Sequence, residues 1–409
     1  MAAKPKVMLI ITQDTKYEEG RYIRAQIEAA GCDVVHLDPS IRRDLGGAEI
    51  GPRAIAAAAG SRIEDVRALG HEGRCQAVMI RGATKLALET YARGEMAGVL
   101  AVGGSMGTSL AGAVLQALPY GLPKLIVSTM ASGFTAPYVG VRDIAMLNAV
   151  TDIAGLNSIS SEVYRNAARG IAGMARGYAA PAASDRPLIL IGTLGTTEKG
   201  VRRIREALEG DGHEVMVFHT SGAGGPTMDS IAAERDVAAV LDLSWTEMVD
   251  ALFGGLAAAG PDRGKAALAR GIPVIFAPGN VDFIIGGPIE AARVQYPGKR
   301  YHVHNPALTA VRTELPELKR IADHVAGLVR EAGGPVRFLV PLGGFSSHDS
   351  AEGHIHDPSL PAPFAAYLRE VLPGHVRLDT LEAHFNDPAF ADAVVAATRE
   401  LVAARRAGA

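Results

Sequence analysis

Short apolar runs alternate with longer amphipathic stretches along the whole chain. The runs are rich in Val, Ile and Leu, which is typical of strands in a parallel sheet that is covered on both faces. In the first half, the pattern predicts one amphipathic helix at Glu18–Ala30 and several strands. These strands are expected at Val7–Thr12, Asp33–Leu37, Ala77–Ile80, Gly98–Val102 and Lys124–Ser128.

The strand and helix pattern restarts after Gly170–Pro187, which we predict to be a helix that leads into a linker. Alternation on both sides of it predicts an α/β fold with two Rossmann-like domains, residues 1–180 and 185–409. Each domain is expected to be a mostly parallel sheet flanked by helices. The second is predicted to contain strands at Leu188–Thr193, His213–Phe218, Ala238–Leu243, Val274–Ala277, Arg337–Val340 and Val376–Asp379, and helices at Gly200–Glu209, Pro363–Leu372 and Asp387–Ala407.

The two halves also begin alike. Thr12 and Thr15 of the first half match Thr193 and Thr196 of the second at one constant offset, without a gap. In both halves a strand is followed by T-x-x-T, a helix, a glycine and a second strand. We interpret this as two domains of one architecture.

Composition narrows the classes of function. The chain has 409 residues, 48% hydrophobic and 21% charged, which is enough to form sizeable cores. Its net charge is −3 with Lys and Arg dispersed, so we expect no nucleic-acid partner. We find neither a signal peptide nor an apolar run of about 18 residues, and expect a cytoplasmic protein without a membrane partner. Cys32 and Cys75 lack metal or redox spacing, which indicates buried thiols in a reducing compartment.

The most informative motif is the glycine-rich turn Gly103–Thr108, which joins an apolar strand to a helix. Such a turn directs backbone N–H groups and the helix dipole toward one point, where an anion, most often a phosphate, is the natural occupant. The same segment spells G-x-S-x-G around Ser105, the nucleophile elbow of serine hydrolases. The sequence alone leaves both interpretations open.

Two other turns are expected beside this one, because the carboxyl ends of parallel strands meet at one edge of a sheet. The first is Thr12–Lys16, where Asp14 offers a carboxylate for Mg²⁺ or a ribose hydroxyl and Lys16 offers a positive charge. The second is Thr129–Gly133. Neither a Walker motif nor G-x-G-x-x-G is found. The predicted nucleotide-binding residues are Thr12, Asp14, Thr15, Lys16, Gly103, Gly104, Ser105, Gly107, Thr108, Thr129, Ser132 and Gly133.

The second half carries a different set of candidates, rich in histidine and arginine. Arginine favours a carboxylate or phosphate substrate, because it forms bidentate charge-assisted hydrogen bonds. The predicted substrate-binding residues are Thr196, Thr197, Asn280, Arg300, Asn305 and Arg312. The predicted catalytic residues are Ser346 as nucleophile or orienting group, His304 or His348 as base, and Asp349 beside them.

The histidines are also candidates for metal ligands. His302 and His304 alternate along the chain, as do His354 and His356, so each pair would face one side of a strand. Neither pair has the i, i+4 spacing of the helical H-E-x-x-H motif. The spacing therefore favours a polar substrate pocket, and we assign no metal ligands.

Long segments resemble the tomato-mosaic-virus-resistance-like ATP-binding domain family of bacteria, fungi and plants. They include GGSMGTS, GPDRGKAALARGIPVIFAPGNVDF, HNPALTAVRTELPEL and PVRFLVPLGGFSSHDSAEG, and the similarity covers nearly the whole chain. The resemblance implies two Rossmann-like domains that bind ATP with Mg²⁺ and form a homodimer. In plant and some bacterial relatives the region is joined to a TIM-barrel domain, which we do not find in this sequence.

One residue departs from the family pattern. Met106 stands where the family's turn usually has glycine, and a side chain there would be strained by about 1 kcal/mol or more if its φ were positive. The backbone conformation of Met106 therefore decides whether the turn keeps its shape.

The expected function is binding of ATP and Mg²⁺, with an enzymatic role in small-molecule carbonyl or carboxylate metabolism. One alternative is a hydrolase or carbon–carbon lyase that acts on a keto acid at an active site between the domains. The other is a non-catalytic scaffold.

Overall fold

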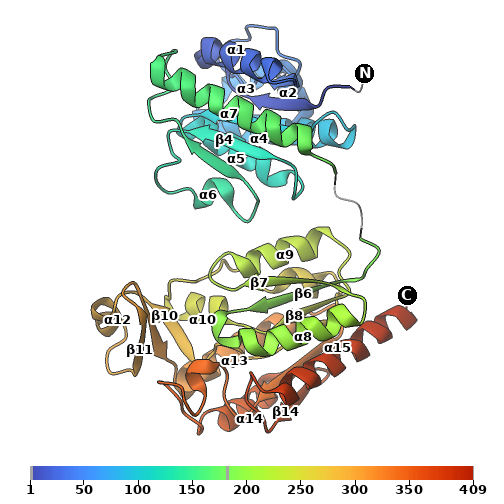
Figure 1. The fold of residues 1–409 in the computed structure, drawn as a ribbon, viewed down its shortest axis with the longest axis vertical. Helices are drawn as coiled ribbons and strands as arrows, with labels where there is room; N and C mark the ends of the chain where they lie inside the picture. Colours follow the sequence, from blue (N-terminus) through green and yellow to red (C-terminus); the bar gives the residue numbers. More distant parts are fainter. Residues whose placement is uncertain (1–2, 181–183, 409) are drawn as a thin grey trace. The chain divides into compact units, whose positions relative to one another are not determined.

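The computed structural model describes residues 3–180 and 184–408 and divides into two compact units, residues 1–182 and 183–409. Each unit contains a parallel sheet flanked by helices (Figure 1). The prediction of an α/β fold with two Rossmann-like domains is therefore confirmed.

The first unit is built on a five-stranded parallel sheet with the order β2-β1-β3-β4-β5. Since β1 pairs with β2 on one side and with β3 on the other, the winding of the sheet reverses between β1 and β3. In open parallel sheets, ligands collect at the carboxyl ends of the strands at such a switch point. The strands are β1 (Lys6–Ile10), β2 (Asp33–Leu37), β3 (Gly98–Gly103), β4 (Lys124–Ser128) and β5 (Ala145–Asn148).

Helices cover both faces of this sheet. Residues of α2, α3, α4 and α5 form the hydrophobic core on one face, and residues of α1 and α7 form the core on the other. The helices are α1 (Gln13–Ala29), α2 (Pro52–Ala58), α3 (Ile63–Ala68), α4 (Glu72–Ala92), α5 (Ser105–Ala117), α6 (Ala136–Val139) and α7 (Ser158–Gly177). The sheet is thus enclosed, and its carboxyl edge is free to form a site.

The strand predicted at Ala77–Ile80 is wrong, because this segment lies inside α4. The buried residues of α4 include Cys75, Met79, Ala83 and Ala87, each four positions after the last. This spacing buries one face of a helix. The four apolar residues at 77–80 are too few to reveal this helical spacing, which extends over residues 75–87.

The second unit repeats the arrangement on a six-stranded parallel sheet with the order β14-β13-β9-β8-β6-β7. As in the first unit, the first strand lies between the second and the third. Gly31 and Gly212 precede the second strand of their units with nearly the same φ, 90° and 87°. The strands are β6 (Leu188–Thr193), β7 (Glu214–His219), β8 (Ala239–Asp242), β9 (Val274–Phe276), β13 (Val336–Pro341) and β14 (Arg377–Leu381).

A small antiparallel sheet with the order β10-β12-β11 is added to the second unit and was not predicted. It consists of β10 (Phe283–Gly286), β11 (Tyr301–Asn305) and β12 (Leu308–Arg312). The unit's helical segments are η1 (Gly195–Thr197), α8 (Glu198–Gly210), α9 (Gly224–Glu234), α10 (Thr246–Phe253), α11 (Lys265–Ala269), α12 (Ile289–Gln295), α13 (Leu315–Val329), η2 (Ser347–Asp349), α14 (Pro361–Val371) and α15 (Pro388–Gly408).

The helix predicted within Gly170–Pro187 is the end of α7, which stops at Gly177, and residues 181–183 of that stretch lie outside the described residues. Among the helices within residues 3–180 and 184–408, none combines the length and the apolar character needed to cross a membrane.

Candidate functional site

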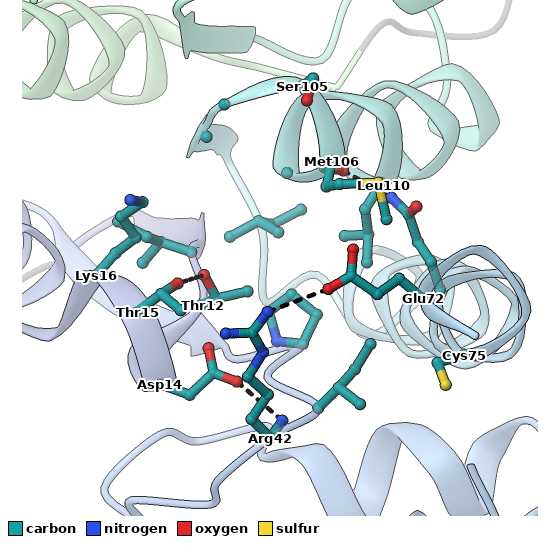
Figure 2. A pocket seen from close by; sticks show the side chains of 18 of the residues that line it. Thr12, Asp14, Thr15, Lys16, Arg42, Glu72, Cys75, Ser105, Met106 and Leu110 are labelled. Atoms are coloured by element: carbon teal, nitrogen blue, oxygen red, sulfur yellow. Dashed lines mark hydrogen bonds and ion pairs between the residues drawn. The ribbon is translucent and has the colours of Figure 1, made fainter. Parts of the chain in front are cut away.

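A pocket with a volume of about 520 Å³ lies at the switch point of the first unit. It opens where β1 and β3 end, and it lies between the start of α1 and the start of α5 (Figure 2). Eight of the predicted nucleotide-binding residues line it, namely Thr12, Asp14, Thr15, Lys16, Gly103, Gly104, Ser105 and Gly107. The structure thus brings together two turns that lie about ninety positions apart in the sequence.

The amino end of α5 forms one wall of the pocket. Gly104 is the residue before the helix, with φ −73° and ψ −162°, and its carbonyl accepts a 2.8 Å hydrogen bond from the N–H of Thr108. The N–H groups of the first helical turn have no partner within a helix. Those of Ser105, Met106 and Gly107 are therefore available to an acceptor in the pocket.

Gly103 and Gly104 differ in what a side chain would meet. A Cβ on Gly103 would lie 2.7 Å from Cα of Gly107, so packing of the turn requires glycine there. A Cβ on Gly104 would meet only Oγ1 of Thr129, at 3.9 Å, which is an ordinary contact. Packing does not require glycine at position 104, and the absence of a side chain leaves the helix end open to a ligand.

Met106 does not distort the turn. It lies in the first turn of α5, and the non-glycine residues with positive φ among the described residues are Val150 and Asn280. The strain expected for a side chain at this position is therefore not present. The Met106 carbonyl accepts a 2.6 Å hydrogen bond from Nε2 of Gln76, which links α5 to α4.

Residues at the start of α1 form the opposite wall (Figure 2). The hydroxyls of Thr12 and Thr15 lie 3.0 Å apart, and Oδ2 of Asp14 accepts a 2.9 Å hydrogen bond from the N–H of Arg42. Lys16 interrupts the helix with φ −135° and ψ 39°, and its ammonium group donates to the carbonyl of Ile153. A lysine has three donors. Its ammonium group has this one hydrogen bond among the residues that the structure describes, so two N–H bonds remain for a ligand.

Charged side chains from two loops and from the start of α4 complete the pocket. Arg42 and Glu72 form a 3.1 Å ion pair, and both side chains are more than 70% exposed. An exposed pair contributes about 0–1 kcal/mol, so a ligand can displace it at little cost. Asp152 also lines the pocket and comes from the loop after β5. In that loop the β-branched Val150 has φ 66°, a strained conformation of the kind found near functional sites.

Four predicted nucleotide-binding residues do not line the pocket: Thr108, Thr129, Ser132 and Gly133. The buried Thr108 hydroxyl donates to the carbonyl of Gly103 at 3.2 Å and lies 2.6 Å from the hydroxyl of Ser128. Thr108 therefore connects α5 to β3 and β4 and does not face a ligand.

Among the described residues, Ser105 is not hydrogen-bonded to a base of the kind that a nucleophile elbow requires, although His71 lines the same pocket. Within the described part of the first unit, no hydrogen bond links its hydroxyl to a histidine. The ring of His36 is buried and bound, with Nε2 3.0 Å from the carbonyl of Ile11 and Nδ1 3.2 Å from Nε2 of Gln13. The geometry at Ser105 therefore favours an anion cradle.

In the second unit, the polar side chains after the ends of β6, β8 and β9 form hydrogen bonds with one another. Oδ1 of the buried Asn280 accepts hydrogen bonds from the hydroxyls of Thr197 at 3.2 Å and Ser244 at 2.8 Å. Its Nδ2 donates to the hydroxyl of Thr196. The predicted substrate-binding residues Thr196, Thr197 and Asn280 are thus brought together, but their polar groups bind one another.

Ser346, Asp349 and Arg312 also lie together, in the interior. The Ser346 hydroxyl donates a 2.7 Å hydrogen bond to Oδ2 of Asp282, and Nη1 of Arg312 lies 3.0 Å from Oδ1 of Asp349. All four side chains are buried. Burial, followed by the nearby Asp349 carboxylate, raises the pKa of Asp282. Ser346 is therefore closed to a substrate, and Arg312 is placed to balance buried carboxylates.

Arg300 and Asn305 have local structural partners. Arg300 donates 2.9 Å hydrogen bonds to Oδ2 of Asp357 and to the carbonyl of His356. Oδ1 of Asn305 accepts from the N–H groups of Ala307 and Leu308, which shapes the turn between β11 and β12. Arg300 directly precedes β11 and Asn305 is its last residue. Both side chains are exposed, and among the described residues they have no hydrogen-bond partner in common.

The predicted bases His304 and His348 come together with His302, and one ring nitrogen of each lies within 4.8 Å of the others. Burial and the neighbouring histidines lower the pKa of His348 to about 4. The alternating spacing of His302 and His304 predicted two of the three members of this group. His348 was predicted as a base, but no sequence signal placed it beside His302 and His304, because it lies more than forty positions away on η2.

Comparison with known proteins gives the family. The N-terminal domain of the Uncharacterised protein family (UPF0261) matches residues 5–180, and the C-terminal domain of the same family matches residues 186–402. The chain belongs to this family. It is 36% identical over 398 residues to a UPF0261 protein of Rhizobium meliloti, a match that covers 97% of this chain and 99% of that protein. A UPF0261 protein of Clostridium tetani is also 36% identical, covering 86% of this chain and 87% of its own length.

A plant protein is related to this UPF0261 chain as well. The ToMV resistance protein Tm-1(GCR237) of Solanum lycopersicum is 29% identical over 419 residues, which cover 96% of this chain and 55% of the plant protein. The predicted relationship to the tomato-mosaic-virus resistance protein is thus confirmed, and ATP binding stays a prediction. Among solved structures, a putative UDP-N-acetylglucosamine 2-epimerase from Listeria monocytogenes is 14% identical and covers 67% of this chain and 79% of its own, with a TM-score of 0.22, a likeness too weak to inform function.

Proposed function

We propose that the first unit binds a nucleoside triphosphate, ATP with Mg²⁺, in the pocket at the β1/β3 switch point. The observation that carries the proposal is the open amino end of α5 in a pocket of about 520 Å³. Pockets of this size suit small molecules, and helix amino ends bind phosphate. The resemblance to a family of ATP-binding domains supports the choice of ligand.

The phosphates would contact the α5 end of the pocket. The N–H groups of Ser105, Met106 and Gly107 would serve as donors, and Lys16 would supply positive charge from the opposite wall. Because a Cβ at Gly104 would meet only one ordinary contact, the space before the helix fits a group that approaches closely.

The remaining lining suits a base and a metal ion. Apolar side chains of Ile41, Cys75 and Leu110 give a surface for a flat ring. Asp14 and Asp152 are the carboxylates that would hold Mg²⁺, which prefers oxygen ligands and is usually bound by one or two carboxylates together with phosphate oxygens. Bound Mg²⁺ would offset the charge of the phosphates in this pocket.

The proposal includes an enzymatic role in carbonyl or carboxylate metabolism, with nucleotide binding as its first step. The alternative of a hydrolase with Ser346 as nucleophile is not favoured, because this hydroxyl is buried and donates to Asp282. The other alternative is a non-catalytic scaffold. Nucleotide binding would fit a scaffold only if the bound nucleotide regulated it.

Isothermal titration of the full chain with Mg·ATP tests the proposal, using Lys16→Met and the control Lys85→Met. Lys85 is exposed on α4 outside the pocket. A charge-assisted hydrogen bond contributes about 1.5–3 kcal/mol, so Lys16→Met is expected to weaken binding about 10- to 100-fold. Lys85→Met is expected to bind as the wild type does. Equal affinity of all three proteins, or binding by none, would contradict the proposal.

A further inference from the structure

Three histidines of the second unit converge at the surface, beside the small antiparallel sheet. His302 and His304 lie on β11, and His348 lies on η2. One ring nitrogen from each lies within 4.8 Å of the other two. Three nitrogens on a tetrahedral zinc ion, at about 2.0–2.1 Å from the metal, are about 3.4 Å apart. Small side-chain rotations would close that difference.

The strand that carries two of the histidines is irregular at this point. In the pairing of β11 with β12, His302 is opposite Ala310 and Val303 is opposite Thr309, but the register shifts between Val303 and Asn305. His304 is the extra residue of this β-bulge. Bulges redirect a side chain and are common next to active sites. β11 is an edge strand of this sheet, and none of the described strands pairs with its outer side.

Buried polar contacts hold the backbone of His348, the third histidine, in place. The N–H of His348 donates a 3.1 Å hydrogen bond to the Ser346 hydroxyl, which itself donates to Asp282. The ring of Phe283 contacts the His348 ring edge-to-face at 5.4 Å between centroids. The next residue, Asp349, is fixed by Arg312. Metal sites need such supporting contacts to hold their ligands in place.

Within residues 3–180 and 184–408, the ring nitrogens of the three histidines have no hydrogen-bond or ion-pair partner. None of the hydrogen bonds or ion pairs between residues that the structure describes uses a ring nitrogen of His302, His304 or His348. A fourth ring, His354, stacks on His302 with centroids 4.6 Å apart and an angle of 9° between the planes. The stacking uses the face of the His302 ring, so its nitrogens, which lie at the ring edge, stay accessible. Buried histidines with structural roles, such as His36, are by contrast hydrogen-bonded.

We propose that His302, His304 and His348 form a binding site for a divalent transition-metal ion of the zinc type. Imidazole nitrogens suit Zn²⁺, Cu²⁺ and Ni²⁺, whereas Mg²⁺ and Ca²⁺ prefer oxygen ligands. Three protein ligands leave the fourth tetrahedral position for water or a substrate atom, as in catalytic zinc sites. All of its residues belong to the second unit, whereas the nucleotide pocket is lined by residues of the first.

Metal titration of the untagged full chain tests the site. The protein is stripped with a chelator, desalted and titrated with ZnCl₂, and binding of one Zn²⁺ per chain is expected. Loss of a residue that only supports a metal ligand lowers metal affinity by about 10- to 100-fold. Because His304 and His348 would bind the metal directly, we expect His304→Ala and His348→Ala to lower the Zn²⁺ affinity by more than about 100-fold. His375→Ala is the matched control, since His375 is exposed in the same unit and outside the cluster.

Cobalt gives a second readout. Co²⁺ added to the stripped wild type is expected to produce the visible absorption of tetrahedral cobalt, which His304→Ala should lack. His304 is exposed on an edge strand, so its replacement leaves the core intact, which far-UV circular dichroism verifies. Zinc uptake that is substoichiometric in the wild type, or unchanged in His304→Ala, would overturn the proposal.

Discussion

The hydroxyl of Ser346 donates a 2.7 Å hydrogen bond to Oδ2 of Asp282 and accepts one from the backbone of His348. A serine in these contacts, with no exposed surface, orders the loop that carries His348 and cannot attack a substrate. The residue that the sequence proposed as a nucleophile is therefore better described as a positioning residue.

Replacement of Ser346 tests this view. We expect Ser346→Ala to lower the free energy of unfolding by about 1–3 kcal/mol, because Asp282 then loses a partner while buried. Urea unfolding followed by circular dichroism measures the change. The wild type is expected to resist labelling by a fluorophosphonate, and labelling at Ser346 would show that the hydroxyl is accessible and contradict the account.

Removal of one partner from an ion pair is expected to cost most in the interior of the second unit. Arg263 is buried, with 2.7 and 2.9 Å hydrogen bonds to both oxygens of Asp242 and a 2.8 Å bond to Glu247. Arg263→Met leaves two buried carboxylates without a cation, which typically costs about 3–5 kcal/mol.

The exposed pair Arg203–Asp392 has the same bidentate geometry, with 2.7 and 2.9 Å bonds, and provides the control. Arg203→Met is expected to change the free energy of unfolding by less than about 1 kcal/mol. Chemical denaturation of both variants gives the comparison, and equal losses would show that burial does not set the strength of these pairs.

Stability is also expected to depend on pH through Asp250. Its buried carboxylate accepts hydrogen bonds from the N–H groups of Ala257 and Ile285, and burial raises its pKa to about 7. In the unfolded chain an aspartate has a pKa of about 3.9. The folded state thus keeps a proton that the unfolded state releases, so the free energy of unfolding falls as pH rises from about 4 to 7.

The size of this fall is at most about 4 kcal/mol for a shift of about three units. Urea unfolding across this pH range measures it, and Asp250→Asn should make the decline shallower because the titrating group is removed. A decline of the same steepness in Asp250→Asn would assign the effect to other groups.

Two glycines of the α5 turn should respond to alanine with opposite signs. Gly103→Ala places Cβ 2.7 Å from the backbone of Gly107 and is expected to destabilise the protein by about 1–3 kcal/mol. Gly107→Ala meets only the Val102 carbonyl at 3.7 Å and is expected to stabilise α5 by about 0.5–1 kcal/mol. Thermal unfolding compares them, and a loss of stability in both would show that the turn tolerates no side chain at either position.

Much of the fold was accessible from the sequence, because buried parallel strands such as Lys124–Ser128 are continuous apolar runs. The strand predicted at Ala77–Ile80 failed since four apolar residues fit a strand and a helix equally well. The edge strand β11 was missed for the opposite reason. Its sequence, Tyr-His-Val-His-Asn, is polar because much of the strand is exposed.

The candidate sites were accessible only in part. Thr12–Lys16 and Gly103–Gly107 follow neighbouring strands, so parallel topology was enough to place them together. The group of His302, His304 and His348 depends on a β-bulge and on a loop from another part of the chain. Burial of Ser346 was equally invisible, since a serine in a glycine-rich loop has the same local sequence whether it is exposed or enclosed.

Substitution at Gly104 tests nucleotide binding without loss of the fold. Asn and Asp are both favoured residues before a helix, so Gly104→Asn and Gly104→Asp should retain α5. Both side chains fill the space before the helix, and Asp adds a negative charge where the phosphates would lie. Gly170→Asp serves as the control, because it introduces the same side chain at an exposed position of α7. A Cβ on Gly170 would meet no atom of the surrounding structure within 4 Å.

Thermal stabilisation by Mg·ATP, measured on these proteins side by side, is the most direct test of the central claim. The account predicts a clear rise in melting temperature for the wild type and Gly170→Asp, a smaller rise for Gly104→Asn and none for Gly104→Asp. The same rise in Gly104→Asp as in the wild type, or no rise in any of the four proteins, would contradict binding of the nucleotide at the amino end of α5.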